Sequence, residues 1–410
     1  MHRIIAAVLA AMACASAAYA QDGLAPPAIT SRLVFTLDEA VAVAGGSAPA
    51  AEAAEAGIRA ARAGRRIAGL RPNPIVDMQV ENVAGTGPYR GFDQAETTVS
   101  FALPIELGGK RSARIAVADA QTQRAVLVEA VTQADIRLQV TQLYVDTVAA
   151  RWRAFTARDR LKITEDALSA AQIRVRAGRA SPLEEQRADV ARLNAQAGAE
   201  RAQRLADAAR TNLERRIGRR LSGVIDMTAL DDLPPIDYSP VAPIDAAGTL
   251  ALAAANADVE YADAGVRLAR SQRVPDITVG PGLRRLEANN DMAAVDQASA
   301  ERSRAEAQLR MIALNVEQAI TDARAQVDNA ATAARNANGP ALAAAREAAR
   351  IARIGYREGK FGQLELLDAE RTLADTRLAA IDALAAYHNA KARLEWLTTP
   401  ALAPAPEQGN

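Results

Sequence analysis

Most of the chain carries its apolar side chains at a helical spacing. From residue 127 onward they recur every three or four positions in two neighbouring seams: Leu127, Val131, Ala134, Leu138, Val145 and Val148 form the first, and Ile136, Val140 and Leu143 form the second. One seam is typical of an ordinary coiled coil, whereas two indicate a helix that is packed on both sides. The same spacing predicts helices over 38–70, 109–176, 182–219, 246–272, 296–356 and 363–397. At roughly 1.5 Å per residue the second of these would be about 100 Å long, which suits a stalk or a duct rather than a compact globule.

Three short stretches follow a period of two instead. In each of them, apolar residues alternate with more polar ones. The apolar residues are Val76, Met78 and Val80 in the first stretch, Val99, Phe101 and Leu103 in the second, and Ile277, Val279 and Leu283 in the third. This alternation predicts strands with one apolar and one polar face. A surface hairpin of a soluble protein would show the same pattern.

The chain repeats itself. Arg176-Ala-Gly178-Arg179 with Leu183-Glu184 matches Arg357-Glu-Gly359-Lys360 with Leu364-Glu365. Each copy predicts a glycine turn between two long helices, which is the tip of a helical hairpin. A purely structural interpretation is that the glycines end the helices and the basic residues complement the helix dipole.

The repeats divide the chain into five predicted segments. A basic start, an apolar run and Ala18-Tyr19-Ala20 predict a signal peptide over 1–20. The others are a first repeat over 21–220, a proline-bearing connector over 221–245, a second repeat over 246–397 and a disordered tail over 398–410.

The second repeat is shorter than the first by about 20 residues between its strand and its tip. After the strand that begins near Ile277, the sequence runs almost directly into a charged helix. A barrel strand needs roughly 9–11 residues to cross a membrane. Residues 291–299 would give at best a poor one, because Asp296 and Gln297 would lie on opposite faces. We therefore expect the second repeat to lack one strand.

Composition excludes several classes of function. The chain has 410 residues with 49 basic and 49 acidic side chains, and this balance argues against nucleic acid as a partner. Its only cysteine, Cys14, lies in the predicted signal peptide, where Ala11-Met12-Ala13 makes a poor lipoprotein cleavage site. With His388 as the one histidine beyond that peptide, we expect no catalytic site, no metal site and no cofactor.

These features together resemble the TolC-like outer-membrane efflux proteins. The most specific segment is Leu103-Pro104-Ile105-Glu106-Leu107-Gly108-Gly109-Lys110-Arg111, which resembles the strand-to-helix corner of the heavy-metal branch, the cobalt–zinc–cadmium and copper–silver systems. Arg71-Pro72-Asn73-Pro74 before the first strand is similar to that branch as well.

The resemblance implies a fold, partners and site residues. The fold would be mainly α with a small β part: long helical hairpins form a periplasmic α-barrel, and strands join a trimeric outer-membrane β-barrel. The partners would be outer-membrane lipid, a periplasmic adaptor and an inner-membrane resistance–nodulation–division pump. The tips would bind the adaptor, the corner residues Pro104, Glu106, Gly108, Gly109, Lys110 and Arg111 would join strand to helix, and Glu365 and Asp368 would ring the periplasmic gate.

The expected function is therefore the outer-membrane channel of a tripartite efflux system for heavy-metal cations. A duct for drugs or secreted proteins would share the architecture. A structural or defective envelope coiled coil is the alternative that a missing strand would favour. A periplasmic adaptor is disfavoured, since it would show a single helical hairpin rather than two.

Overall fold

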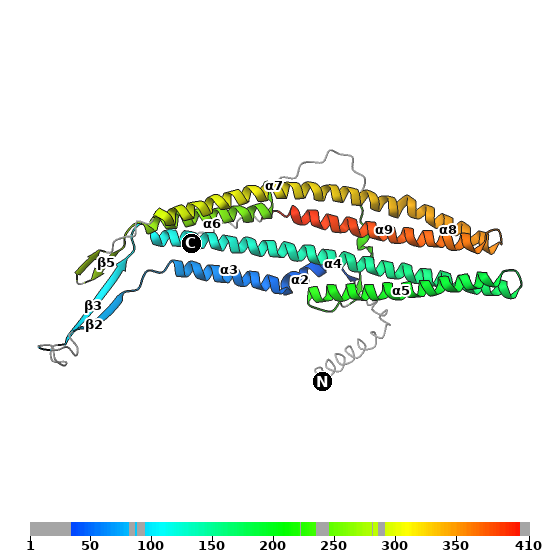
Figure 1. The fold of residues 1–410 in the computed structure, drawn as a ribbon, viewed down its shortest axis with the longest axis horizontal. Coiled ribbons are helices and arrows are strands. Elements are labelled where there is room, and N and C mark those ends of the chain that lie inside the picture. The colour runs from blue at the N-terminus through cyan, green and yellow to red at the C-terminus, as the bar shows by residue number, and fades with distance from the viewer. Residues whose placement is uncertain are drawn as a thin grey trace, which may run out of the picture.

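The molecule is a long, slender rod with strands at one end and helix tips at the other (Figure 1). The structure is a computed structural model that describes residues 34–81, 87, 95–221, 223–234, 246–280, 282–285 and 292–401. The predicted signal peptide lies outside the described residues.

Eight α-helices build the described part of the rod. They are α2 (Leu37–Ser47), α3 (Pro49–Ala68), α4 (Lys110–Arg176), α5 (Pro182–Ile217), α6 (Leu250–Gln272), α7 (Met292–Asn336), α8 (Leu342–Arg357) and α9 (Gln363–Leu397). The helices predicted over 109–176, 182–219 and 363–397 are confirmed to within two residues. None of the described helices is long and apolar enough to cross a membrane.

Two predicted helices are interrupted at prolines. The helix expected over 38–70 is divided at Ala48, whose extended ψ of 130° ends α2, and Pro49 then opens α3. A residue before proline is pushed out of the helical region, which explains this break. The helix expected over 296–356 contains a π-helical turn, Ala337–Ala341, around Pro340. Proline cannot donate the usual helical hydrogen bond, so the turn widens there.

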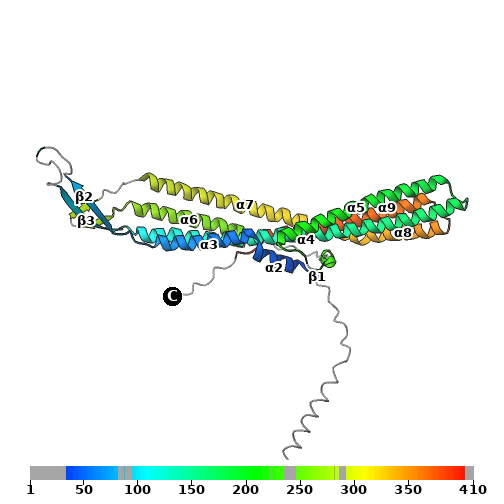
Figure 2. The same cartoon turned by 90° about the horizontal axis from the view of Figure 1, so that it is seen from below.

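Helix α4 is the spine of the rod. It packs against α3 and α6 towards the strands and against α5 and α9 towards the tips (Figures 1 and 2). Members of both predicted seams are buried along its middle: Leu138, Val145 and Val148 from the first, and Ile136 and Val140 from the second. The predicted packing on two sides is therefore confirmed.

The largest side chains of the core gather at the middle of the rod. Tyr144 is fully buried and its hydroxyl donates to the Phe35 carbonyl at 2.9 Å. Trp152 donates from Nε1 to the Met227 carbonyl at 3.0 Å. Phe35 belongs to β1 (Val34–Phe35), which pairs in parallel with β4 (Val224–Ile225) of the connector. The described part of the connector thus forms a strand and a short 3-10 helix, Met227–Leu230, that are docked on α4.

Four antiparallel strands form the sheet at the other end. They are β2 (Ile75–Glu81), β3 (Glu96–Ile105), β5 (Ile277–Gly280) and β6 (Gly282–Arg285), in the order β2-β3-β5-β6. The prediction that the second repeat lacks one strand is wrong. Leu283 does not continue the third strand but pairs back with Val279 across a tight reversal. The hairpin of the second repeat therefore has both strands, β5 and β6, but each is only four residues long.

The segment predicted to be a disordered tail begins in an ordered conformation. The Leu250 amide donates to the Thr399 carbonyl at 2.9 Å, and the Ala401 amide donates to the Gly248 carbonyl at 3.0 Å. Backbone bonds thus hold residues 398–401 against the start of α6, so the prediction of disorder is wrong for these four. Residues 402–410 lie outside the described part.

Candidate functional site

The predicted corner lies where the strands meet the helices. Gly108 and Gly109 both have left-handed backbones, with φ of 67° and 72°, and Gly109 is the residue that caps α4. A Cβ atom on Gly108 would lie 2.5 Å from the Cβ of Val274, which precedes β5. Only glycine fits there, because both the backbone angle and the approach of the second repeat exclude a side chain.

Asp276 links this corner to the second repeat. Its Oδ1 accepts a hydrogen bond from the Leu107 amide at 3.0 Å and lies 2.8 Å from Lys110 Nζ. The side chain of Lys110 is 14% exposed, so the ion pair is largely shielded from water. Because its two partners lie far away in the sequence, the role of Asp276 was missed in the sequence analysis.

Two arginines link the corner to the end of α3. Arg114 pairs with Glu106, with 2.9 Å between Nη2 and Oε2, and also donates to the Leu70 carbonyl at 3.2 Å. Arg111 donates to the Gly69 carbonyl at 2.6 Å. Together with the bonds of Asp276, these contacts join the end of α3, the start of α4 and the start of β5 at one place.

The charges of the corner stabilise one another. The hydrogen bond from Arg114 lowers the pKa of Glu106 below its ordinary value, although burial opposes this. Burial alone would raise the pKa of Asp276, but the bonds from Lys110 and the Leu107 amide outweigh it, and the pKa falls. Both carboxylates are therefore ionised at neutral pH and resist acid.

The two predicted tips lie together at the far end of the rod (Figures 1 and 2). Gly178 and Gly359 have left-handed backbones with φ of 69° and 72°, as the predicted turns require. Leu183 and Leu364 are 55% and 63% exposed. The arginines of the predicted tips, Arg176 and Arg357, are exposed at the ends of α4 and α8.

A small polar cluster connects the two tips. The Tyr356 hydroxyl donates to Glu184 Oε1 at 3.2 Å. Arg174 Nε lies 3.6 Å from the same oxygen, and its guanidinium lies over the Tyr356 ring, 5.0 Å from the centroid. Burial raises the pKa of Tyr356, and the negative charge of Glu184 adds to the effect. Tyr356 and Arg174 were not among the predicted site residues.

The predicted gate carboxylates lie on the exposed face of α9. Glu365 and Asp368 are both exposed and, among the described residues, form no ion pair. The Glu365 carboxylate folds back close to Gly362, the residue before α9. Two residues beyond Asp368, Glu370 is buried and pairs with Arg353 of α8, with 2.8 Å between Oε2 and Nη2. The two predicted gate carboxylates face solvent, whereas Glu370 joins α9 to α8.

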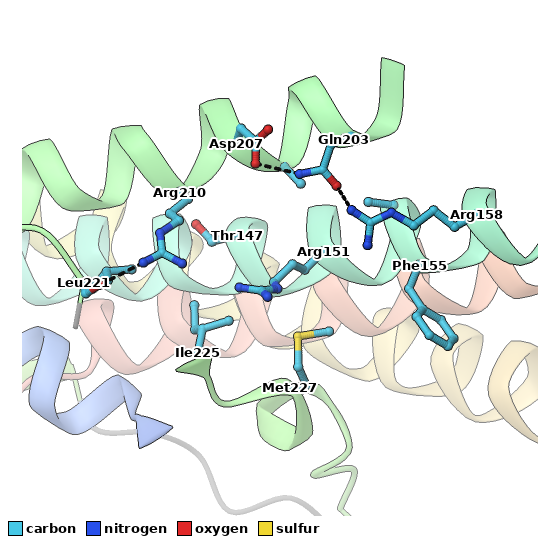
Figure 3. A pocket seen from close by; sticks show the side chains of 12 residues that line it. Thr147, Arg151, Phe155, Arg158, Gln203, Asp207, Arg210, Leu221, Ile225 and Met227 are labelled. Atoms are coloured by element: carbon cyan, nitrogen blue, oxygen red, sulfur yellow. Dashed lines mark hydrogen bonds between the residues drawn. The ribbon is translucent and has the colours of Figure 1, made fainter. Parts of the chain in front are cut away.

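A pocket of about 360 Å³ lies at the middle of the rod, between α4, α5 and the connector (Figure 3). Arg210 enters it, where its charge is matched by Glu214 at 2.9 Å and one of its donors reaches the Leu221 carbonyl at 2.8 Å. Gln203 takes a bond from Arg158 and donates to Asp207 at 2.7 Å. The bond from Arg210 fastens the start of the connector to α5, and the bond from Arg158 fastens α4 to α5.

The described part of the chain contains no candidate metal site. No group of three or more His, Cys, Asp or Glu side chains there is placed to hold a metal ion. His388 contacts the Leu230 carbonyl at 3.2 Å, and burial lowers its pKa. The imidazole is therefore packed against the connector, and its neutral form is favoured.

Comparisons with known proteins agree with this geometry. Residues 43–219 match the family model described as outer membrane efflux protein. The cobalt-zinc-cadmium resistance protein CzcC of Cupriavidus metallidurans is 29% identical over 379 residues, which are 88% of this chain and 89% of that protein. Among solved structures, CusC has a TM-score of 0.73 at 16% identity and covers 90% of this chain and 93% of its own. The outer-membrane channel OprN has a TM-score of 0.72 at 20% identity, with 89% and 90% covered.

Proposed function

Because the chain belongs to the outer membrane efflux protein family, we propose that it is the outer-membrane channel of a tripartite system that exports heavy-metal cations. The observation that carries the choice of cargo is the similarity to CzcC, which extends over nearly the whole chain. The periplasmic adaptor and the inner-membrane pump are the expected partners, and three copies of the chain are expected to form the channel.

The sheet has the two faces that a channel wall in a membrane needs. In the register of β2 and β3, Val76 lies opposite Phe101 and Met78 opposite Val99. All four side chains are largely exposed, and Val76 is 69% exposed, so the apolar face is uncovered in one subunit. We infer that outer-membrane lipid covers it, and that neighbouring subunits close the strand edges, which cannot remain unpaired in lipid.

The opposite face of the same strands is polar and acidic. Asp77 lies opposite Ser100, Gln79 opposite Thr98 and Glu81 opposite Glu96. Gln79 donates to Glu81 at 2.7 Å. A lumen lined by these carboxylates would attract cations and repel anions, which supports a cationic cargo.

The tips are the proposed contact with the adaptor and the proposed gate. Exposed Leu183 and Leu364, with exposed charge around them, give a small surface suited to another protein's helix tips. In a trimer, Glu365 and Asp368 would form two stacked rings of carboxylates at the periplasmic entrance.

The test is to express the chain in a metal-sensitive bacterium that lacks its own outer-membrane component. We expect zinc, cobalt or cadmium tolerance to rise only when the adaptor and pump are expressed with it. Heat-modifiable gel mobility of the outer-membrane fraction checks assembly in the same cells. An assembled channel that changes tolerance to drugs but not to metals would contradict the proposed cargo and favour the drug-duct alternative.

A further inference from the structure

The residues that line the pocket at the middle of the rod lie at different depths. Thr147, Leu221 and Ile225 are buried and form its inner end. Phe155 and Asp207 are exposed and form its rim. The volume of about 360 Å³ falls within the range of about 300–1,000 Å³ that is typical of sites for small molecules. The pocket can therefore hold a small ligand and shield part of it from water.

Two arginines point into the same part of this pocket. Arg151 lies one helical turn after the buried Thr147 on α4, so both side chains leave the helix on the same face. Arg151 and Arg210 of α5 are both partly buried, and their guanidinium groups meet above Ile225 and Met227 of the connector (Figure 3). Two like charges are thus brought together where water has limited access.

The described contacts satisfy one of these arginines and leave the other without a partner. Arg210 donates from Nε to Glu214 at 2.9 Å and from Nη2 to the Leu221 carbonyl at 2.8 Å. The bond from Arg210 lowers the pKa of Glu214, so this carboxylate is ionised at neutral pH. Arg151 forms no hydrogen bond or ion pair with any residue that the structure describes.

The remaining charges of the pocket do not compensate for Arg151. Asp207 accepts a hydrogen bond from Gln203 at 2.7 Å, and Arg158, which is exposed, donates to the same Gln203. The charged side chains that line the pocket or pair with a lining residue are Arg151, Arg158, Arg210, Asp207 and Glu214. Three of them are positive and two are negative, so one positive charge is left over.

A carboxylate is the group that suits this arrangement. The planar guanidinium of arginine donates two parallel hydrogen bonds to the two oxygens of a carboxylate. One negative charge between Arg151 and Arg210 would relieve their repulsion and match the positive charge that is left over. Beside the arginines, the side chains of Phe155, Ile225 and Met227 offer apolar surface. A ligand with a short apolar body would cover that surface and gain from its burial.

We propose that this pocket binds a small organic carboxylate, whose charged group pairs with Arg151 and Arg210 and whose apolar body packs against the connector. Such a ligand contacts α4, α5 and the connector at the same time, so its binding stabilises the docking of the connector on the two helices. All of the residues involved belong to one copy of the chain. The inference is therefore independent of the proposed cargo and partners.

Equilibrium dialysis with labelled benzoate tests the site. The full-length protein is extracted in detergent in its heat-modifiable form, in a buffer without other carboxylates, and empty micelles serve as the blank. Benzoate combines a carboxylate with an apolar ring, whereas benzyl alcohol has the ring without the charge and acetate has the charge without the ring. We expect saturable binding of benzoate, weak competition by acetate and no competition by benzyl alcohol.

Substitutions on α4 locate the binding. Arg151→Gln removes the charge and the paired donors, so the affinity for benzoate should fall about tenfold or more. Arg151→Lys keeps the charge but loses the planar fork, so its affinity should lie between the two. The matched control is Arg160→Gln, which removes an exposed arginine of the same helix that does not line this pocket. Its affinity for benzoate should equal that of the unmodified chain.

Thermal unfolding distinguishes a ligand-binding arginine from a structural one. Arg151→Gln removes one of two like charges that meet, so without benzoate this variant should unfold at the same temperature as the unmodified chain or at a higher one. Benzoate should raise the unfolding temperature of the unmodified chain and of Arg160→Gln, and it should have little effect on Arg151→Gln.

Three results would overturn the inference. The first is a lack of saturable benzoate binding in the assembled protein, whether an acidic side chain of a neighbouring copy fills the pocket or water alone solvates Arg151. The second is an equal loss of affinity in Arg151→Gln and Arg160→Gln, because binding would then follow the total charge of the helix. The third is a lower unfolding temperature of Arg151→Gln without benzoate, which would assign Arg151 to the packing of the connector.

Discussion

The two ends of the rod are built in opposite ways. At the corner, the shielded ion pair of Lys110 with Asp276 joins the two repeats, and Arg114 pairs with Glu106 beside it. At the tips, the two helical hairpins are connected by the cluster of Tyr356, Glu184 and Arg174. The comparison teaches that the angle between sheet and helices is fixed, whereas the hairpins at the far end are held by contacts that little energy would break.

Glycine is used differently at the two ends, and this gives the largest predicted effect. Gly108 and Gly178 have nearly the same φ, 67° and 69°, but a Cβ on Gly108 would collide with Val274, whereas a Cβ on Gly178 meets nothing within 4 Å. We expect Gly108→Ala to lower the free energy of unfolding by about 3 kcal/mol, through strain and collision together. Gly178→Ala, the matched control, should cost about 1 kcal/mol from strain alone. Equal losses in urea unfolding would contradict the comparison.

The corner ion pair gives the next effect. Asp276→Ala removes the acceptor for Lys110 and for the Leu107 amide. We expect the free energy of unfolding to fall by about 2 kcal/mol. The control at the tip is Glu358→Ala, because Glu358 and Lys360 are 56% and 74% exposed in their side chains. An exposed pair contributes about 0–1 kcal/mol, so this variant should unfold almost like the unmodified chain. A comparable loss in both variants would show that the corner is not shielded.

Acid and alkali should act on opposite ends. The pKa values of Glu106 and Asp276 are lowered in the folded chain from ordinary values of 4.5 and 3.8. Their contribution to the free energy of unfolding is therefore complete when the pH is above these ordinary values, and it is lost as the pH falls below them. The pKa of Tyr356 is raised from its ordinary value of 10.0. Its contribution to the free energy of unfolding is therefore present when the pH is below 10.0 and is lost as the pH rises above 10.0. Hydrogen exchange at the two ends, followed against pH, checks this. Loss of protection at the tips in acid, before the corner, would contradict it.

Breaking the link between the tips should have a smaller effect on stability. Tyr356→Phe removes one hydrogen bond to Glu184, and we expect a loss of about 1 kcal/mol or less. The two hairpins should then separate more often, which planar-bilayer recording would detect as a higher open probability. Tyr261→Phe, on α6 and far from the tips, is the control and should leave opening unchanged.

The proposed gate carboxylates should affect selectivity and leave stability almost unchanged. Glu365 and Asp368 are exposed, so Glu365→Gln with Asp368→Asn should unfold like the unmodified chain. Cation selectivity in a planar bilayer should fall, and block by multivalent cations should weaken. Unchanged selectivity in a channel that still assembles as a trimer would show that these are ordinary surface charges.

The sequence predicts what depends on local geometry. The glycine turns at Gly178 and Gly359 and the reversal at Gly108-Gly109 follow from residues that are adjacent in the chain. The break at Pro49 could also have been predicted from the sequence, because the residue before a proline leaves the helical region. The predicted helix over 38–70 should have been divided there.

What the sequence could not predict depends on contacts between distant segments. Asp276 bonds to Leu107 across 169 residues, and Tyr356 to Glu184 across 172. The spacing of polar residues contains no signal for such pairs. Leu283 was assigned to the third strand because its alternation with neighbouring residues is the same whether the strand continues or reverses.

The backbone pairing that joins the two flanks of each repeat has a consequence for the order of folding. Val34 pairs with Val224 around the first repeat, and Thr249 bridges Pro400 around the second. The first repeat can therefore close its loop while the second is still being synthesised. The second cannot close until Pro400 has been made, because that residue supplies the last contact. Closure over such a range is slow in both repeats, and the order of synthesis places the first repeat ahead of the second.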